Sequence, residues 1–171
     1  MGENGLKTKV ALEFMTHREK RGATAQDGRK HGLEACEAEV TSAVQDGEGE
    51  GGTDSNGTGR IAALLWFQGE ADAMRREDAV AYAGRMEAFV RDVRRDLAMP
   101  NLLVIQVGIA TAQNQGKWLD LVRKQQRAVR MPNLKYVDAM GLPLANDITH
   151  LTTQAQVRLG KMLADAYIAT L

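Results

Sequence analysis

The chain has 171 residues, a length that fits one domain of ordinary size and leaves little for a second. Its 22 Lys and Arg side chains balance 22 Asp and Glu side chains, which argues against a nucleic-acid partner bound through a strongly basic surface. No apolar run approaches the ~20 residues that cross a bilayer, and no signal-peptide pattern opens the sequence, so we expect no membrane partner and favour the cytoplasm. The single cysteine, Cys36, agrees with a reducing compartment.

Residues 1–59 and 60–171 differ in composition. The first 59 residues hold 11 of the 17 glycines. Only 7 of these 59 residues are Leu, Ile, Val or Phe, which is too few to bury a sizeable core. Val10 and Phe14 stand at helical spacing, 33–44 could form a short polar helix, and 47–59 reads as a flexible linker. We therefore expect 1–59 to be a glycine-rich extension, weakly helical or disordered, beside an ordered domain at 60–171.

Within 60–171, apolar runs of strand length alternate with segments of helical periodicity. The expected strands are 61–67, 102–110 and 134–139, and the expected helices are 76–99, 117–130 and 153–168. The first helix has an apolar face formed by Met86, Phe89, Val90, Val93 and Leu97. Arg94 lies off that face, and Thr153 with Gln156 fits a capping box at the start of the last helix. Such alternation predicts a parallel sheet covered by helices, with ligands bound beyond the carboxyl ends of the strands.

Polar loops follow the first two expected strands. In the first loop, Gln68 offers a neutral amide donor, Gly69 lets the backbone turn, and Glu70 accepts hydrogen bonds. From the residues alone, a plain strand-to-helix connection with acidic residues near the helix start is the better explanation. The second loop, 111–116, fits a solvated connection better than a substrate contact.

Asp147 and His150 stand three residues apart, immediately before the last expected helix. A turn there can place the carboxylate beside one imidazole nitrogen, as in the base-and-orienter pair of a serine hydrolase. A helix-capping Asp beside an exposed His is the alternative reading of this short pattern. Convergence of the acidic loop residues on His150 could also suggest a metal, but regular ligand spacing is lacking, so we expect no metal.

Three segments together resemble a known family: LLWFQGEADA at 64–73, LLVIQVGIA at 102–110, and the tail from Val137, which includes DITHLTTQAQVRLG. They are similar to carbohydrate esterases of the sialate O-acetylesterase type, in the SGNH/GDSL hydrolase superfamily. The resemblance covers 60–171 and implies a three-layer α/β/α fold with a flavodoxin-like sheet. It also implies removal of acetyl groups from sugars or polysaccharides by Ser, His and Asp, without metal or cofactor.

By this resemblance, His150 is the general base and Asp147 its orienting carboxylate. Gln68 and Gly69 match the block that helps to form the oxyanion hole, and Glu70 shapes the same loop. Neutral donors at a developing oxyanion contribute about 10²- to 10³-fold each to turnover.

The nucleophile block of the family, G-Q-S-N after its first strand, has no counterpart in this sequence. Ser55 precedes an Asn but follows no apolar strand, and the other serine, Ser42, lies in a polar helical context. We therefore expect weak or no activity from a truncated or remodelled fold, since losing a triad serine costs about 10⁶-fold in turnover. The same gap predicts that 61–67 is an exposed sheet edge open to self-association. The alternative function is a non-catalytic sugar-binding or protein-interaction remnant of the fold.

Overall fold

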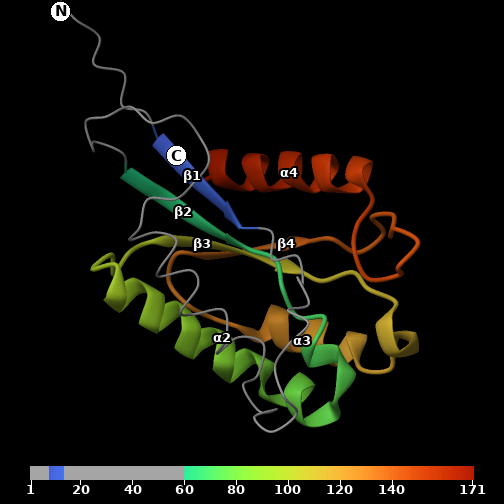
Figure 1. Cartoon of the computed structure of the whole chain (residues 1–171). Helices are drawn as coiled ribbons and strands as arrows, with labels where there is room; N and C mark the ends of the chain where they lie inside the picture. The colour runs from blue at the N-terminus through green and yellow to red at the C-terminus, as the bar shows by residue number, and fades with distance from the viewer. Residues whose placement is uncertain (1–7, 14–59) are drawn as a thin grey trace, which may run out of the picture.

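The computed structural model describes residues 60–171 and the backbone of residues 8–13 (Figure 1). Four parallel strands form one sheet in the order β1-β2-β3-β4. The strands are β1 (Thr8–Glu13), β2 (Arg60–Trp66), β3 (Leu103–Gly108) and β4 (Leu134–Asp138). The α-helices are α2 (Arg76–Asp96), α3 (Leu119–Ala128) and α4 (Thr153–Ile168), and two short 3₁₀ turns are η1 (Asp72–Met74) and η2 (Gln113–Gly116).

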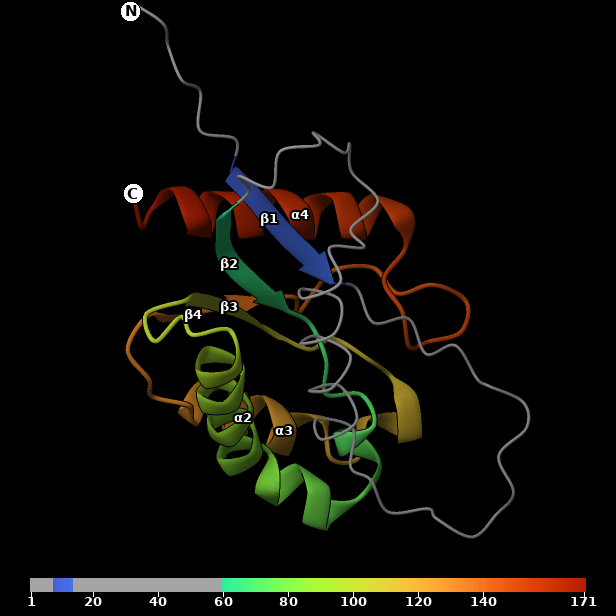
Figure 2. The same cartoon turned by 60° about the vertical axis from the view of Figure 1, so that its left-hand side comes forward.

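Helices cover both faces of the sheet, so the described part of the chain has three layers. Helices α2 and α3 lie on one face and α4 on the other, as the two views in Figures 1 and 2 show. Side chains alternate along β3 accordingly, with Val104 packed toward α2 and Ile105 toward α4. The α/β class with a helix-covered parallel sheet, predicted from the alternation of apolar patterns, is confirmed.

The core beneath α2 and α3 follows the predicted apolar face. Met86, Phe89, Val90 and Val93 are buried, and the Phe89 ring lies 4.3 Å from the Trp66 ring on β2. Arg94, in contrast, was expected outside the core and is only 8% exposed. Its guanidinium donates hydrogen bonds to the carbonyl oxygens of Leu102, Pro132 and Asn133, so it fastens the end of α2 to the chain around β3 and β4.

On the opposite face, α4 packs Leu159 and Leu163 against β3 and β4. Its amino-terminal cap is Thr152, whose hydroxyl accepts the Ala155 N–H at 3.2 Å. The predicted cap, Thr153, is therefore wrong by one residue, because Thr152 has the extended backbone that a cap residue needs. None of the helices in 60–171 is both long and apolar enough to cross a membrane.

Strand β1 corrects two expectations about the start of the chain. Residues 8–13 are a strand rather than a helix, and they pair in parallel with β2, from Thr8 opposite Arg60 to Glu13 opposite Trp66. Consequently β2 lies between β1 and β3 and is not a sheet edge. Ladder pairing to an apolar neighbouring strand outweighs the weak helical spacing of so few residues. The predicted helix at 33–44 and linker at 47–59, with Cys36, Ser42 and Ser55, lie outside the described residues.

The observed strand order fits part of a flavodoxin-like sheet. In the order 2-1-3-4-5, removing the outermost strand leaves four strands whose order follows the sequence, as observed. A strand therefore does precede residue 61, which corrects the expectation that both first strands are lacking. All four strands point the same way, so their carboxyl ends meet at one edge of the sheet.

Candidate active site

The predicted site residues lie in loops at the carboxyl edge of the sheet. Strand β2 runs into Gln68, Gly69 and Glu70, β3 runs into the loop that contains η2, and β4 runs into the loop that ends at His150. In Figure 1 these loops gather beyond the arrowheads of the strands. This edge is where open α/β sheets bind ligands.

His150 and Asp147 form the most direct contact of the site. The imidazole Nδ1 lies 2.6 Å from Asp147 Oδ2, and Asp147 Oδ1 accepts the backbone N–H groups of Thr149 and His150, each at 2.9 Å. Hydrogen bonds from the His150 side chain and from these backbone groups lower the pKa of Asp147 to about 2. Both side chains remain about half exposed, at 45% for His150 and 51% for Asp147. The pair is therefore ionised at Asp147 and open to a reactant.

Gln68 and Gly69 are buried directly behind the end of β2. Gln68 Nε2 donates to Asp72 Oδ2 at 2.8 Å, and burial raises the pKa of that carboxyl. The Gln68 carbonyl accepts from Tyr82 Oη at 3.1 Å and from Gln126 Nε2 at 3.2 Å. Gly69 has a φ of +146°, and a Cβ there would lie 3.1 Å from the Gln126 amide. Glycine is required at this position because neither the backbone angle nor the space suits a side chain.

Glu70 connects this loop electrostatically to the histidine. Burial raises the pKa of its carboxyl, while hydrogen bonds from the backbone N–H groups of Glu70 and Gly69 and the nearby charge of His150 oppose that increase. The structure thus brings the Glu70 carboxyl close enough to His150 for their charges to interact, although the two residues are 80 positions apart in sequence.

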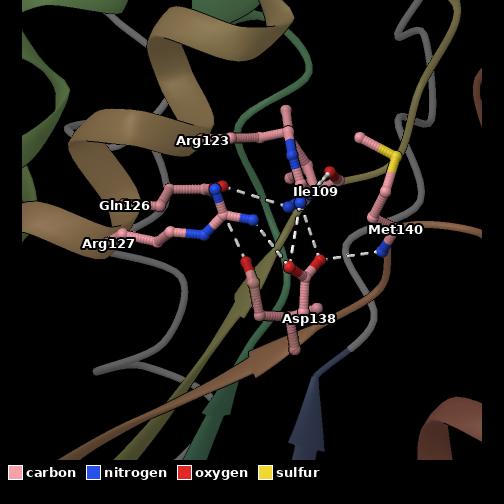
Figure 3. A network of polar contacts seen from close by, with 7 residues as sticks. Ile109, Arg123, Gln126, Arg127, Asp138 and Met140 are labelled. Atoms are coloured by element: carbon pink, nitrogen blue, oxygen red, sulfur yellow. Dashed lines mark hydrogen bonds and ion pairs between the residues drawn. The ribbon is translucent and has the colours of Figure 1, made fainter.

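A second polar network beneath the edge holds the strand ends together (Figure 3). Arg123, only 3% exposed, donates to both carboxylate oxygens of Asp138, at 2.8 and 2.9 Å, and to the carbonyl oxygen of Ile109. Arg127 donates to Asp138 at 2.8 Å, and the Met140 N–H donates to the same carboxylate. This network fixes α3 to the ends of both β3 and β4, where the loops of the site begin.

Hydrogen bonding keeps Asp138 charged. Partial burial opposes ionisation, but the bonds from Arg123, Met140 and Arg127 outweigh it and lower the pKa to about 2. Gln126 adds a neutral link, since its Oε1 accepts the Ile109 N–H at 3.0 Å and its Nε2 reaches the carbonyls of Gln68 and Val107.

Sequence reasoning did not assign Arg123 or Gln126. Both occupy positions i+1 and i+4 from Val122, on the buried side of α3, and polar residues at such positions are the signal that could have identified them.

Metal chemistry has no arranged donor set here. Among the described residues, no group of three or more His, Cys, Asp or Glu is placed to hold a metal ion. Asp72 and Asp138 are engaged by Gln68 and by arginines, respectively.

The described part also contains no serine, since Ser42 and Ser55 fall in 14–59. The structure therefore places His150 and Asp147 in contact, and residues 60–171 contain no serine hydroxyl that could accompany them.

The described residues thus form a three-layer α/β fold with a His–Asp pair at the carboxyl edge of its sheet. The family model for carbohydrate esterases, described as sialic acid-specific acetylesterase, matches residues 47–169. The chain belongs to this carbohydrate esterase family.

One curated relative and one solved structure agree with this assignment. A probable carbohydrate esterase of Arabidopsis thaliana is 45% identical over 111 residues, covering 65% of this chain and 42% of the relative. An X-ray structure of a protein from Arabidopsis thaliana superimposes with a TM-score of 0.68 at 38% identity, over 77% of this chain and 51% of that one. The chain thus spans about two fifths of the length of the curated relative.

Proposed function

We propose that this chain carries the general-base side of a carbohydrate O-acetylesterase of the SGNH type, with a serine mechanism. The supporting observation is the 2.6 Å contact between His150 Nδ1 and Asp147 Oδ2 at the carboxyl edge of the sheet. Family membership supports ester hydrolysis on a carbohydrate at a coarse level. We further propose that the group removed is acetyl and that hydrolysis uses a serine nucleophile.

The proposed roles follow from which atoms are engaged. Asp147 holds Nδ1, so His150 Nε2, which makes no hydrogen bond to any described residue, is the nitrogen available to take a proton. In the proposed reaction a serine hydroxyl gives its proton to Nε2 as its oxygen attacks the acetyl carbonyl. The ionised Asp147 stabilises the resulting imidazolium, which then returns the proton to the sugar oxygen as the ester bond breaks. Water repeats the sequence and releases acetate.

The loop after β2 is proposed to form the oxyanion side of the site. In the present arrangement Gln68 Nε2 donates its hydrogen bond to Asp72, and the Gly69 N–H donates to the Glu70 carboxylate. An oxyanion bound here would compete with Asp72 or Glu70 for one of these hydrogen bonds. Burial raises the pKa of both carboxyls. Protonation of the competing carboxyl would lower the electrostatic cost of this exchange.

The missing serine block of the family, with neither Ser42 nor Ser55 following an apolar strand, supports a low rate for the 171 residues by themselves. It also supports the second candidate function, a sugar-binding or protein-interaction protein that uses the same loops without hydrolysis. The two candidates differ in what the His–Asp pair contributes, so variants of that pair separate them.

The test combines hydrolysis and binding. The wild-type chain, His150→Ala, Asp147→Asn and the control Asp165→Asn, which alters an exposed carboxylate on α4, are incubated with a fluorogenic acetyl ester. We expect turnover close to that of buffer for all four proteins. Turnover well above buffer that disappears only in the His150 and Asp147 variants would show that the chain supplies a nucleophile and would refute the low-rate proposal.

Binding of an O-acetylated oligosaccharide, followed by NMR, gives the second readout. Binding weakened by His150→Ala and Asp147→Asn supports an esterase site. Saccharide binding that both substitutions leave unchanged favours the non-catalytic candidate. Absence of saccharide binding together with absence of turnover contradicts both candidates.

A further inference from the structure

The loop after β3 contains three successive residues with a left-handed backbone. Asn114 has φ 50° and ψ 34°, Gln115 has φ 54° and ψ 27°, and Gly116 has φ 67°. L-residues enter this region as single residues and rarely in succession, because Cβ then crowds the following carbonyl oxygen. Glycine tolerates the conformation, but Asn114 and Gln115 hold it against a steric penalty.

Hydrogen bonds tie this turn to both loops of the candidate site. The Ala112 N–H donates to the carbonyl of Ile148 at 2.8 Å, and Ile148 lies between Asp147 and His150 in sequence. On the other side, Asn114 Nδ2 donates at 3.3 Å to the carbonyl of Met74, at the end of the short turn that follows Glu70. The left-handed turn thus lies between the histidine loop and the loop after β2, as Figure 2 shows for η2.

Ile148 shares the unusual backbone. Its φ is 56°, which is rarer still for a β-branched residue, and its N–H and carbonyl are both fixed by hydrogen bonds, to Ala145 and Ala112. Two strained segments therefore hold each other in place at the same edge of the sheet. Conformations of this kind persist where surrounding contacts over-determine them, and they cluster at ligand-binding and catalytic sites.

The Gln115 side chain is exposed at this turn and is available to a ligand. Its amide makes no hydrogen bond to any described residue, whereas the Asn114 amide is used to hold Met74. A free primary amide offers one acceptor and two donor hydrogens, which match the donor and acceptor character of a sugar hydroxyl. Apolar or aromatic ligand groups would gain nothing from it.

We propose that Gln115 is a specificity-determining residue that hydrogen-bonds hydroxyl groups of the sugar ring bearing the ester, and that Asn114 is a positioning residue for it. The inference rests on the proposed esterase function and adds the part of the site that recognises the sugar. It assigns discrimination between a sugar ester and a plain ester to one side chain.

The test uses Gln115→Gly, a substitution that relieves the backbone penalty while it removes the amide. We expect the melting temperature to rise and the affinity for a mono-O-acetylated sugar to fall about 3- to 10-fold, the range for one or two lost neutral hydrogen bonds. Affinity for phenyl acetate, an ester without hydroxyl groups, should stay unchanged. A merely structural role would not give a more stable protein that binds one ester less well.

Gln115→Ala provides the second variant, since it removes the amide without the freedom of glycine. Asn101→Ala is the matched control, because it removes an exposed amide at the opposite end of the sheet. Equal sugar affinity in wild type and both Gln115 variants would overturn the inference. If His150→Ala weakens phenyl acetate binding in the same series, that result would leave the esterase proposal standing. If the wild-type chain binds neither the acetylated sugar nor phenyl acetate, both the esterase proposal and the role of Gln115 are overturned.

Discussion

Replacing Asp138 with Asn tests whether the arginine-bound carboxylate holds the carboxyl edge of the sheet together. The substitution keeps the size of the side chain and removes its negative charge. It leaves Arg123, which is 3% exposed, with the Ile109 carbonyl as its remaining anchor of full strength. Arg127 loses the same partner but is 54% exposed and can turn to water.

The size of the effect can be worked from two contributions. A pKa of about 2 instead of 3.8 corresponds to about 2 kcal/mol at full strength, at 1.36 kcal/mol per pK unit. Asp138 is 37% exposed, so solvent screening reduces this contribution to about 1 kcal/mol. The second contribution is the buried charge of Arg123 left without its carboxylate; a fully stranded charge costs ~3–5 kcal/mol, and we take about 1–2 kcal/mol because Asn still accepts one bond and Arg123 keeps Ile109. The expected loss is about 2–3 kcal/mol in the free energy of unfolding.

Urea denaturation of wild type and Asp138→Asn at pH 7, 4 and 3 measures this loss and its pH dependence. A carboxyl whose pKa is lower in the folded state stabilises the protein above pH ~4, and this stabilisation disappears as pH falls toward 2. The difference between the two proteins should therefore be largest at pH 7 and smaller at pH 3. Asp165→Asn, which breaks an exposed pair with Lys161, should cost less than ~1 kcal/mol. An Asp138→Asn loss no larger than this control, or one independent of pH, would refute the reasoning.

Three further predictions concern other contacts. Gly108→Ala should cost about 2–3 kcal/mol in thermal unfolding, because its Cβ would lie 1.8 Å from the tyrosine hydroxyl of β4, whereas Gly84→Ala on exposed helix surface should stabilise by ~0.5–1 kcal/mol. Arg94→Ala should cost about 2–4 kcal/mol in urea unfolding by stranding three carbonyls, and truncation of exposed arginines of the same helix should change little. Carboxyl NMR should place the Asp147 titration midpoint near 2, and His150→Ala should raise it toward 3.8; an unchanged midpoint would contradict the contact.

The alternation of strands and helices could be predicted because its signals are long and periodic. The faces of α2 and β3 follow from apolar spacing alone, and the ends of three predicted helices differ from the structure by no more than a few residues. The contact of Asp147 with His150 also follows from sequence, since a three-residue separation within one turn leaves little room for another outcome. Predictions of this kind need only local geometry.

Buried charge could not be predicted in the same way. Arginine is usually exposed, so sequence alone predicts that Arg94 and Arg123 lie at the surface. Their burial is favourable only because other elements supply hydrogen-bond acceptors: backbone carbonyls for Arg94 and the Asp138 carboxylate for Arg123. Likewise, the proximity of Glu70 to His150 depends on how two loops from different strands come together. Such partners become visible only when the register of the sheet is known.

Strand β1 is a part of the fold that the sequence alone did not predict. Six residues of modest hydrophobicity become a strand because β2 offers them a parallel ladder, so the signal lies in the partner rather than in residues 8–13 themselves. In the proposed serine mechanism the nucleophile follows the first strand of the fold, and β1 occupies the place of that strand in the order of the sheet. The carboxyl end of β1 therefore marks where a nucleophile for His150 would have to enter. A serine introduced by scanning positions directly after Glu13 should create His150-dependent acetyl-ester turnover at one position if the sheet order defines the site, and at none if it does not.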